Sequence, residues 1–138
     1  MIDITDHTTI GEALEAAIAR YASLSLLAVP ANPGRNYLPE GRKFSYAEAG
    51  RLVDALKACY QSAGYGVGHR IGLLLESRPE HMLHKLAMNS LGICCVPINP
   101  DYKRRELNYL VDHAPLDVLV CLPAWLAAVP VWLPDSRS

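Results

Sequence analysis

Apolar residues recur with two different periods between Arg70 and Pro100, and the change of period predicts a strand, a helix and a second strand. The run from Ile71 to Leu75 is short and apolar, as in a strand. The run from Ile93 to Ile98 is apolar throughout, which is typical of a strand covered on both faces in a parallel sheet. From Pro79 to Leu91 the apolar spacing is three or four residues, as one buried helix face requires. That face comprises Met82, Leu83, Leu86, Ala87, Ser90 and Leu91. A helix of this length can supply the crossover between parallel strands.

Both ends of this helix carry recognisable signals. Ser77 and Glu80 form a capping-box pattern, in which the Ser77 hydroxyl accepts from the Glu80 amide and the Glu80 carboxylate reaches back. Pro79 fits the first helical position because the amide that it lacks would have no helical partner. Gly92 predicts the end of the helix.

The rest of the chain alternates between helical and strand patterns. Thr9 with Glu12, and Ser45 with Glu48, are two further capping-box patterns that predict helix starts. The expected elements are a helix from 9 to about 21, a strand at 24–29, a loop at 30–41, an extended piece at 42–44, a helix from 45 to 63, a helix at 103–113 and a strand at 117–121. The inward positions of the last two helices are Ala49, Leu52, Val53, Leu56, Tyr60 and Ala63, and Leu107, Leu110 and Val111. This order predicts an α/β fold, a layered sheet that is at least partly parallel with helices packed on it.

The composition indicates one globular domain without a general affinity for nucleic acid. Of 138 residues, 51% are hydrophobic and 20% are charged, and the formal net charge is −1. A chain without net positive charge is not attracted to nucleic acid or to an anionic membrane surface. The N-terminus carries acids where a signal peptide has basic residues, so we expect a cytoplasmic protein. The most apolar stretch, residues 118–133, is too short and too interrupted by proline to form a transmembrane segment.

Two sets of side chains resemble metal or redox sites but are better explained as structural. The four cysteines, at positions 59, 94, 95 and 121, form no C-x-x-C pair, and Cys94 and Cys95 lie on an expected buried strand. We therefore interpret them as reduced structural thiols. His81 and His84 have a spacing that can bind zinc, but they lie opposite the apolar helix face beside Lys85 and lack a third ligand. A solvated helix face explains them better than a metal site.

The remaining candidates are also assigned structural roles. Gly64 to Gly68 is rich in glycine, but it follows a helix and opens a strand, whereas a nucleotide-binding turn follows a strand and opens a helix. His69 precedes a strand, and His113 ends a helix, where an imidazolium favours the helix dipole. Glu12 and Glu15 share an exposed helix face. The residues themselves therefore predict a scaffold with no catalytic, cofactor-binding or metal-ligating residue.

Four segments together resemble the N-terminal region of the AMP-forming acyl-adenylate ligases, the superfamily of acyl-CoA synthetases, peptide-synthetase adenylation domains and beetle luciferases. In chain order they are FSYAEAGRLVDALKACYQSAG (44–64), GVGHRIGLLLESRPEH (66–81), LAMNSLGICCVPINP (86–100) and RRELNYLVDHAPLDVLV (104–120). Each segment consists mostly of helix-capping residues, glycines and regularly spaced apolar residues. All four segments nevertheless occur at the spacing along the chain that is found in that family. The departures are small: His69 replaces the usual Asp, and Ser77 replaces a frequent Asn.

The resemblance implies that residues 1–121 form part of the N-terminal subdomain of the ligase fold, with residues 122–138 as an unassigned tail. Full-length relatives use ATP, Mg and coenzyme A to activate a carboxylic acid, often in fatty acid metabolism. The phosphate loop ending in Pro-Lys-Gly, the hinge and the catalytic lysine of that family have no counterpart in these 138 residues. The resemblance therefore implies a fragment of an ATP-dependent acyl-CoA ligase that is inactive alone.

Two alternatives remain open from the sequence. The first is a non-catalytic α/β interaction module that pairs with another chain, because an incomplete sheet leaves unpaired strand edges that favour self-association. The second is a small nucleotide-binding protein, which depends on Gly64 to Gly68 alone.

Overall fold

The computed structural model describes residues 1–123, which form four helices and five strands in the order that the sequence predicts. The helices are α1 (Ile10–Tyr21), α2 (Tyr46–Ser62), α3 (Pro79–Ser90) and α4 (Arg104–His113). The strands are β1 (Ser25–Val29), β2 (Arg42–Ser45), β3 (Arg70–Leu74), β4 (Cys94–Pro97) and β5 (Val118–Cys121). Most of the expected tail, residues 124–138, lies outside the described residues. None of the helices in the described part is long and apolar enough to cross a bilayer.

The centre of the fold is a parallel sheet with the strand order β4-β3-β5. Ile71 of β3 is in register with Cys95 on one side and Val118 on the other. Strands β1 and β2 form a separate antiparallel pair. The prediction of an α/β fold with a partly parallel sheet and helices packed on it is confirmed.

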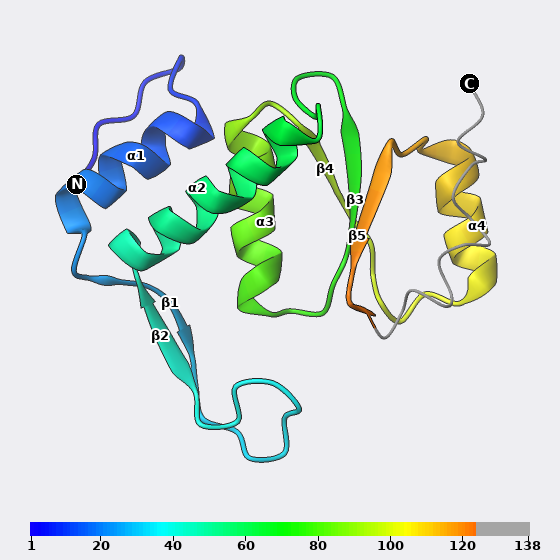
Figure 1. Cartoon of the computed structure of the whole chain (residues 1–138), viewed down its shortest axis with the longest axis horizontal. Coiled ribbons are helices and arrows are strands. Elements are labelled where there is room, and N and C mark those ends of the chain that lie inside the picture. The colour runs from blue at the N-terminus through cyan, green and yellow to red at the C-terminus, as the bar shows by residue number, and fades with distance from the viewer. Residues whose placement is uncertain (124–138) are drawn as a thin grey trace.

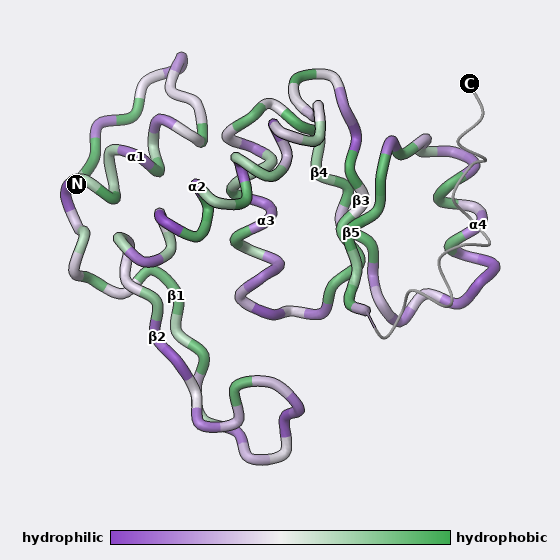
Figure 2. Tube along the Cα trace, in the orientation of Figure 1, coloured by the Kyte–Doolittle hydropathy of each residue, from purple (hydrophilic) through white to green (hydrophobic). Residues whose placement is uncertain are grey.

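Helices cover both faces of this sheet. Figure 1 shows α2 and α3 on one face and α4 on the other. Because side chains alternate along a strand, Ile71 and Leu73 pack toward α2 and α3, whereas Leu74 packs toward α4. Full burial of one such side chain stabilises the fold by about 1.5–3 kcal/mol. The hydrophobic colouring in Figure 2 is accordingly concentrated along the three strands.

The outer layer consists of α1, which packs against α2 and α3. Its N-terminus has the complete capping box: the Glu12 amide donates to Thr9 Oγ1 at 3.1 Å, and the Thr9 amide donates to the Glu12 carboxylate at 3.0 Å. In α2 only one of the two bonds forms, from the Glu48 amide to Ser45 Oγ at 3.1 Å.

The predicted capping box at the start of α3 is wrong. The N-cap residue is Arg78, and no side chain caps the helix there. Pro79 occupies the first turn as predicted, and it restricts the preceding residue to extended geometry, which Arg78 adopts at φ −121° and ψ 161°. Glu80 Oε2 lies 3.5 Å from Arg78 Nε instead of reaching Ser77. The end of α3 is confirmed, because Gly92 follows it with a φ of +72°.

Four burial predictions are also wrong, and one of them is Ala63, which follows the last turn of α2 and is exposed. Met82 and Leu52 were expected on buried helix faces but are 42% and 40% exposed, because each lies at the margin of its apolar stripe. Cys94 was expected on a strand covered on both faces, yet it is exposed. The reason is the strand order, which makes β4 an edge strand that the helices cover only in part.

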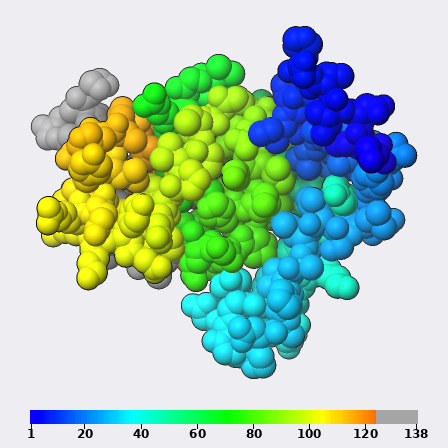
Figure 3. Space-filling view, turned by 180° about the vertical axis from the view of Figure 1, so that it is seen from behind, coloured from blue at the N-terminus to red at the C-terminus, as the bar shows by residue number. Residues whose placement is uncertain are grey.

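The loop from Pro30 to Gly41 projects from the body of the molecule, as the space-filling view in Figure 3 shows. It connects β1 to β2. Gly41 is required at its end, because it has a φ of +79° and an added Cβ would lie 2.6 Å from the Val29 carbonyl oxygen. The chain can therefore pair β2 with β1 directly after a twelve-residue excursion.

Gly72→Ala should destabilise the protein by about 1–3 kcal/mol, as overpacking of a core does. An added Cβ would lie 2.6 Å from Leu116 Cδ1 and 2.8 Å from Leu119 Cδ1. Gly66→Ala is the matched control, since nothing lies within 4 Å of its added Cβ and its φ is not positive. Urea unfolding midpoints would test this, and equal midpoints for the two variants would contradict it.

Candidate functional site

A crevice opens where the loops after β3 and β4 separate. The two strands are adjacent and parallel, but β3 leads into α3 on one face and β4 leads into α4 on the other. The loops must therefore part at the carboxyl edge of the sheet, and in open α/β sheets ligands bind in such a crevice. The cavity here has a volume of about 730 Å³.

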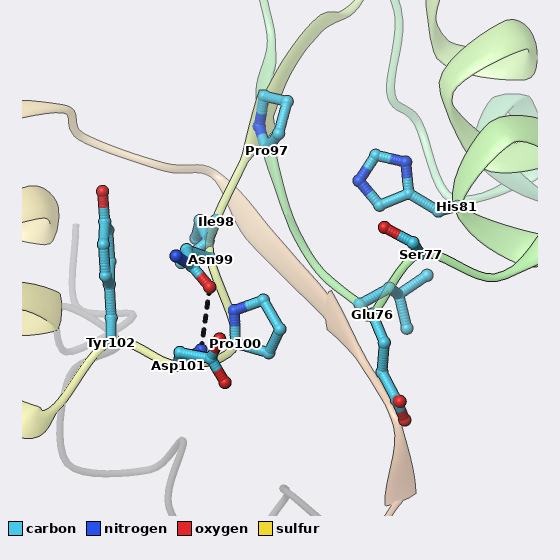
Figure 4. A pocket seen from close by; sticks show the side chains of 10 residues that line it. Glu76, Ser77, His81, Pro97, Ile98, Asn99, Pro100, Asp101 and Tyr102 are labelled. Atoms are coloured by element: carbon cyan, nitrogen blue, oxygen red, sulfur yellow. Dashed lines mark hydrogen bonds between the residues drawn. The ribbon is translucent and has the colours of Figure 1, made fainter. Parts of the chain in front are cut away.

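Both loops contribute polar side chains to the crevice. Glu76, Ser77 and His81 come from the β3 side, and Asn99, Asp101 and Tyr102 come from the β4 side. Figure 4 shows Ser77 and the His81 ring pointing toward the β4 side across the opening. The arrangement brings together residues about 20 positions apart in the sequence. Of these residues, only His81 was considered as a candidate ligand, and it was assigned to a solvated helix face.

The wall that follows β4 is held by backbone bonds. The Ile98 amide donates to the Leu73 carbonyl at 3.0 Å, which extends the ladder one residue past Pro97. Asn99 Oδ1 then accepts from the Asp101 amide at 2.9 Å, and the Asn99 carbonyl accepts from Tyr102 at 3.1 Å. This turn is therefore fixed before any ligand is bound.

The crevice offers hydrogen-bonding groups and has no excess of positive charge. Glu76 and Asp101 are acidic, and burial together with the nearby Lys85 ammonium lowers the pKa of His81. The imidazole of His81 is therefore neutral near pH 7 and can both donate and accept. Within residues 1–123 no three His, Cys, Asp or Glu side chains lie close enough together to hold a metal ion.

A second groove of about 380 Å³ adjoins the crevice and shares Ser77 and His81 with it. It runs between the loop Pro30–Gly41 and the start of α3. The Tyr37 hydroxyl donates to the Ser77 carbonyl at 3.0 Å, and the Arg78 guanidinium carbon lies 4.2 Å from the centre of the Tyr37 ring. Tyr37 therefore fastens the loop to the turn that begins α3.

The loop itself is organised around Arg35, which no sequence pattern singled out. Its guanidinium donates to the carbonyls of Pro30 at 2.8 Å, Tyr37 at 2.8 Å and Leu38 at 2.6 Å. It also lies 5.0 Å from the centre of the Tyr37 ring. The only available signal was an arginine and a tyrosine within a segment of prolines, glycines and asparagines.

His84 does not lie on a solvated helix face, so that interpretation is wrong for this residue. Its Nδ1 is 2.7 Å from the Tyr60 hydroxyl, because α2 packs across α3 at this point. Burial lowers the pKa of His84, although the Glu80 carboxylate opposes this shift and His81 adds to it. Burial, with smaller contributions from Cys95 and Cys59, raises the pKa of Tyr60 to about 12.

The other candidates have structural contacts. His69 Nδ1 accepts from the Gly66 amide at 3.0 Å, and this bond closes the Gly64–Gly68 turn, which connects a helix to a strand as predicted. His113 Nδ1 lies 2.8 Å from the Tyr109 carbonyl at the end of α4. Glu12 serves the α1 cap, and Glu15 is exposed. All four cysteines are free.

Comparison with known proteins assigns these elements to a family. The family model described as AMP-binding enzyme matches residues 27–136, and this range contains all four resembling segments and both grooves. The chain belongs to the AMP-binding enzyme family. The resemblance to the adenylate-forming ligases is therefore confirmed, and α1 lies outside the matched range.

Individual relatives agree with this assignment. The mouse medium-chain acyl-CoA ligase ACSF2 is 29% identical over 105 residues, which are 76% of this chain and 16% of the mouse protein. The zebrafish ACSF2 is 25% identical over 114 residues, which are 83% of this chain and 18% of that protein. The chain thus spans about one sixth of the length of these ligases.

Solved structures share the fold. The N-terminal subdomain of Klebsiella oxytoca NpsA superposes with a TM-score of 0.70 at 21% identity, covering 80% of this chain and 27% of that one. Rhodopseudomonas palustris MatB superposes with a TM-score of 0.62 at 27% identity, covering 67% of this chain and 18% of MatB. The expectation of an N-terminal subdomain of the ligase fold is confirmed by the first of these.

The stability of the protein should fall as the pH drops from about 7 to about 5. The folded state keeps His84 neutral because its pKa is lowered, whereas the unfolded chain takes up a proton near pH 6.5. The stability that depends on a neutral His84 is therefore present above that pH and is lost as the pH falls below it. We expect the denaturation midpoint to change less with pH in His84→Gln than in the unmodified protein. His81, whose pKa is also lowered, should account for pH dependence that is left. An unchanged pH dependence in His84→Gln would contradict the prediction.

Tyr37→Phe should loosen the loop Pro30–Gly41 while keeping the aromatic ring next to Arg35 and Arg78. The lost bond to the Ser77 carbonyl is exposed, so we expect a cost of about 0.5–1.5 kcal/mol at most, together with faster amide hydrogen exchange in the loop. Tyr109→Phe is the control, because the ring of Tyr109 is 65% exposed and its hydroxyl makes no hydrogen bond to residues 1–123. Unchanged exchange in the loop of Tyr37→Phe would contradict the fastening role.

Proposed function

We propose that this chain is part of an ATP-dependent acyl-CoA ligase. Such an enzyme joins a carboxylate to ATP, releases pyrophosphate, and transfers the acyl group from the adenylate to the thiol of coenzyme A, releasing AMP. The observation that carries the proposal is the preformed crevice at the carboxyl edge of the sheet, within the range that matches the family. The acyl-CoA ligases among its relatives favour this activity within the family.

The described residues contribute the scaffold of that enzyme and one wall of its ligand-binding region. They present hydrogen-bonding side chains but no cluster of metal ligands. We assign the binding of ATP, Mg and coenzyme A to the complete ligase, because the 138-residue sequence contains no phosphate loop ending in Pro-Lys-Gly. The isolated chain is then inactive in adenylate formation.

The proposal also covers the carboxylic acid that the enzyme activates and the location of the enzyme in the cell. The ACSF2 proteins are named as medium-chain acyl-CoA ligases and as mitochondrial. We propose a fatty acid as the carboxylic acid, and hence a role in fatty acid metabolism. We propose a cytoplasmic location for this protein. Fractionation of cells that express the chain from its own gene would test the location.

The purified 138-residue chain should release no pyrophosphate from ATP when it is mixed with Mg, coenzyme A and a medium-chain fatty acid. Pyrophosphate release that depends on the fatty acid would contradict the proposal that the isolated chain is inactive in adenylate formation.

A chimera tests whether this region can serve as part of an acyl-CoA ligase. Residues 27–123 of this chain would replace the aligned region of the mouse ligase, and we expect the product to form AMP when both fatty acid and coenzyme A are supplied. The same chimera with Gly72→Val is the control, since it should lose its folded core and its activity together. A chimera that is soluble and cooperatively folded but inactive would refute the assignment.

A further inference from the structure

The two walls of the crevice are held in different ways. On the β4 wall, the Ile98 amide donates to the Leu73 carbonyl at 3.0 Å, which joins this wall to the central strand. On the β3 wall, the Arg78 amide donates to the Glu76 carbonyl at 2.7 Å, and this bond lies within the turn itself. It shapes the turn without joining it to another part of the protein. The position of the β3 wall therefore depends on contacts made from outside the turn.

One such contact comes from the loop Pro30–Gly41. The Tyr37 hydroxyl donates to the Ser77 carbonyl at 3.0 Å, across 40 positions of sequence. The buried residues Leu75 and Pro79 hold the two ends of the turn, so the hydroxyl acts on the three residues between them. This hydrogen bond links the loop to the wall of the crevice.

The ring of Tyr37 provides a second link. The Arg78 guanidinium carbon lies 4.2 Å from the centre of the ring, which is a cation–π distance. Arg78 Nη1 in turn lies 4.0 Å from Glu76 Oε1, so the ring supports the arginine that faces a carboxylate of the crevice. Arg78 Nε is buried and makes no hydrogen bond within residues 1–123, although Glu80 Oε2 is 3.5 Å away. The Tyr37 ring is therefore a main support of this guanidinium.

The loop can support the turn because it is held together by its own bonds. The Arg35 guanidinium donates to three carbonyls of the loop at 2.6–2.8 Å. The Asn32 amide donates to the Pro39 carbonyl at 2.8 Å and brings the two sides of the loop together. Tyr37 thus projects from a framework that does not depend on the turn that it contacts.

We propose that Tyr37 is a positioning residue for the ligase reaction, which holds Glu76 and Ser77 where they bind substrate in the crevice. Tyr37 does not line the crevice, so it acts through the turn. The inference rests on the proposed function, and it adds the loop Pro30–Gly41 to the parts of the chain on which activity depends.

The lining of the crevice determines which substrates are affected. It carries two carboxylates, hydroxyl groups, an amide and an imidazole. Such a lining suits uncharged groups that donate and accept hydrogen bonds, and the carboxylates disfavour phosphate groups and other carboxylates. ATP and coenzyme A both carry uncharged groups of this kind, whereas a fatty acid has none. We therefore expect Tyr37 to affect the binding of one of these two substrates and to leave that of the fatty acid unchanged.

Two variants in the chimera of residues 27–123 with the mouse ligase test the inference. Tyr37→Phe keeps the ring and loses the bond to Ser77, so the KM for either ATP or coenzyme A should rise roughly threefold to tenfold. The kcat and the KM for the fatty acid should not change, because the loss affects substrate binding alone. Tyr37→Leu loses both links and should raise the same KM further. Tyr109→Phe, on the exposed face of α4, is the control and should leave every constant unchanged.

The outcomes separate this inference from the proposed function. The unmodified chimera tests the function itself. An active chimera in which neither Tyr37 variant changes a KM would overturn the inference and leave the function standing. Variants that raise all three KM values together, or that lower kcat alone, would also overturn it, because they indicate a general loss of structure.

Hydrogen exchange in the 138-residue chain gives a test that needs no activity. Tyr37→Phe should speed the exchange of the Ser77 and Arg78 amides, because the turn loses its link to the loop. Unchanged exchange at these two amides would overturn the inference whether or not the chimera is active. Circular dichroism with a cooperative urea transition confirms that each variant is folded, and if Tyr37→Leu does not fold, the comparison of Tyr37→Phe with Tyr109→Phe decides.

Discussion

The backbone pairing of β3 with a strand on each side is the constraint on which the rest of the structure depends. Both sides of β3 are used, so its backbone leaves no free edge, and its side chains are buried on both faces. A helix on each face is then required to cover them. Gly72 shows how tight this arrangement is, because three apolar side chains from neighbouring segments occupy the space that a Cβ would need. The positions of the helices and of the crevice follow from this strand order.

Much of the fold could be predicted from sequence because local chemistry decides it. Thr9 and Gly92 act through their own hydrogen bonds and backbone geometry, and both behave as predicted. Ser77 fails because two local signals compete: Pro79 forces the residue before it into the capping position, and this effect is stronger than the preference of serine for a cap. The predictions for Met82 and His84 are wrong for a different reason. Which margin of a helix stripe is covered depends on the position of the next helix, and periodicity carries no information about that.

The candidate site was less predictable than the fold. Its position follows from α3 and α4 lying on opposite faces, and the sequence predicted the two helices without predicting their sides. Ser77 was assigned to a helix cap, and its proximity to Asn99 across the crevice is a property of strand adjacency. Tyr37 is the clearest omission, because its hydrogen-bond partner lies 40 residues further along the chain. The family resemblance, by contrast, could be recognised from the sequence because helix caps, glycines and apolar spacing are all local features of the chain.

The bond between the Arg70 amide and the Asp117 carboxylate, at 2.7 Å, has a consequence for the time course of folding. It joins residues 47 positions apart, whereas β3 meets β4 at Arg70 and Cys94, about half as far along the chain. Each doubling of a loop costs about 0.6 kcal/mol of closure entropy, so β3, α3 and β4 assemble at lower cost than β5 can join them. We therefore expect a nascent chain to form its crossover unit first and to dock β5 afterwards.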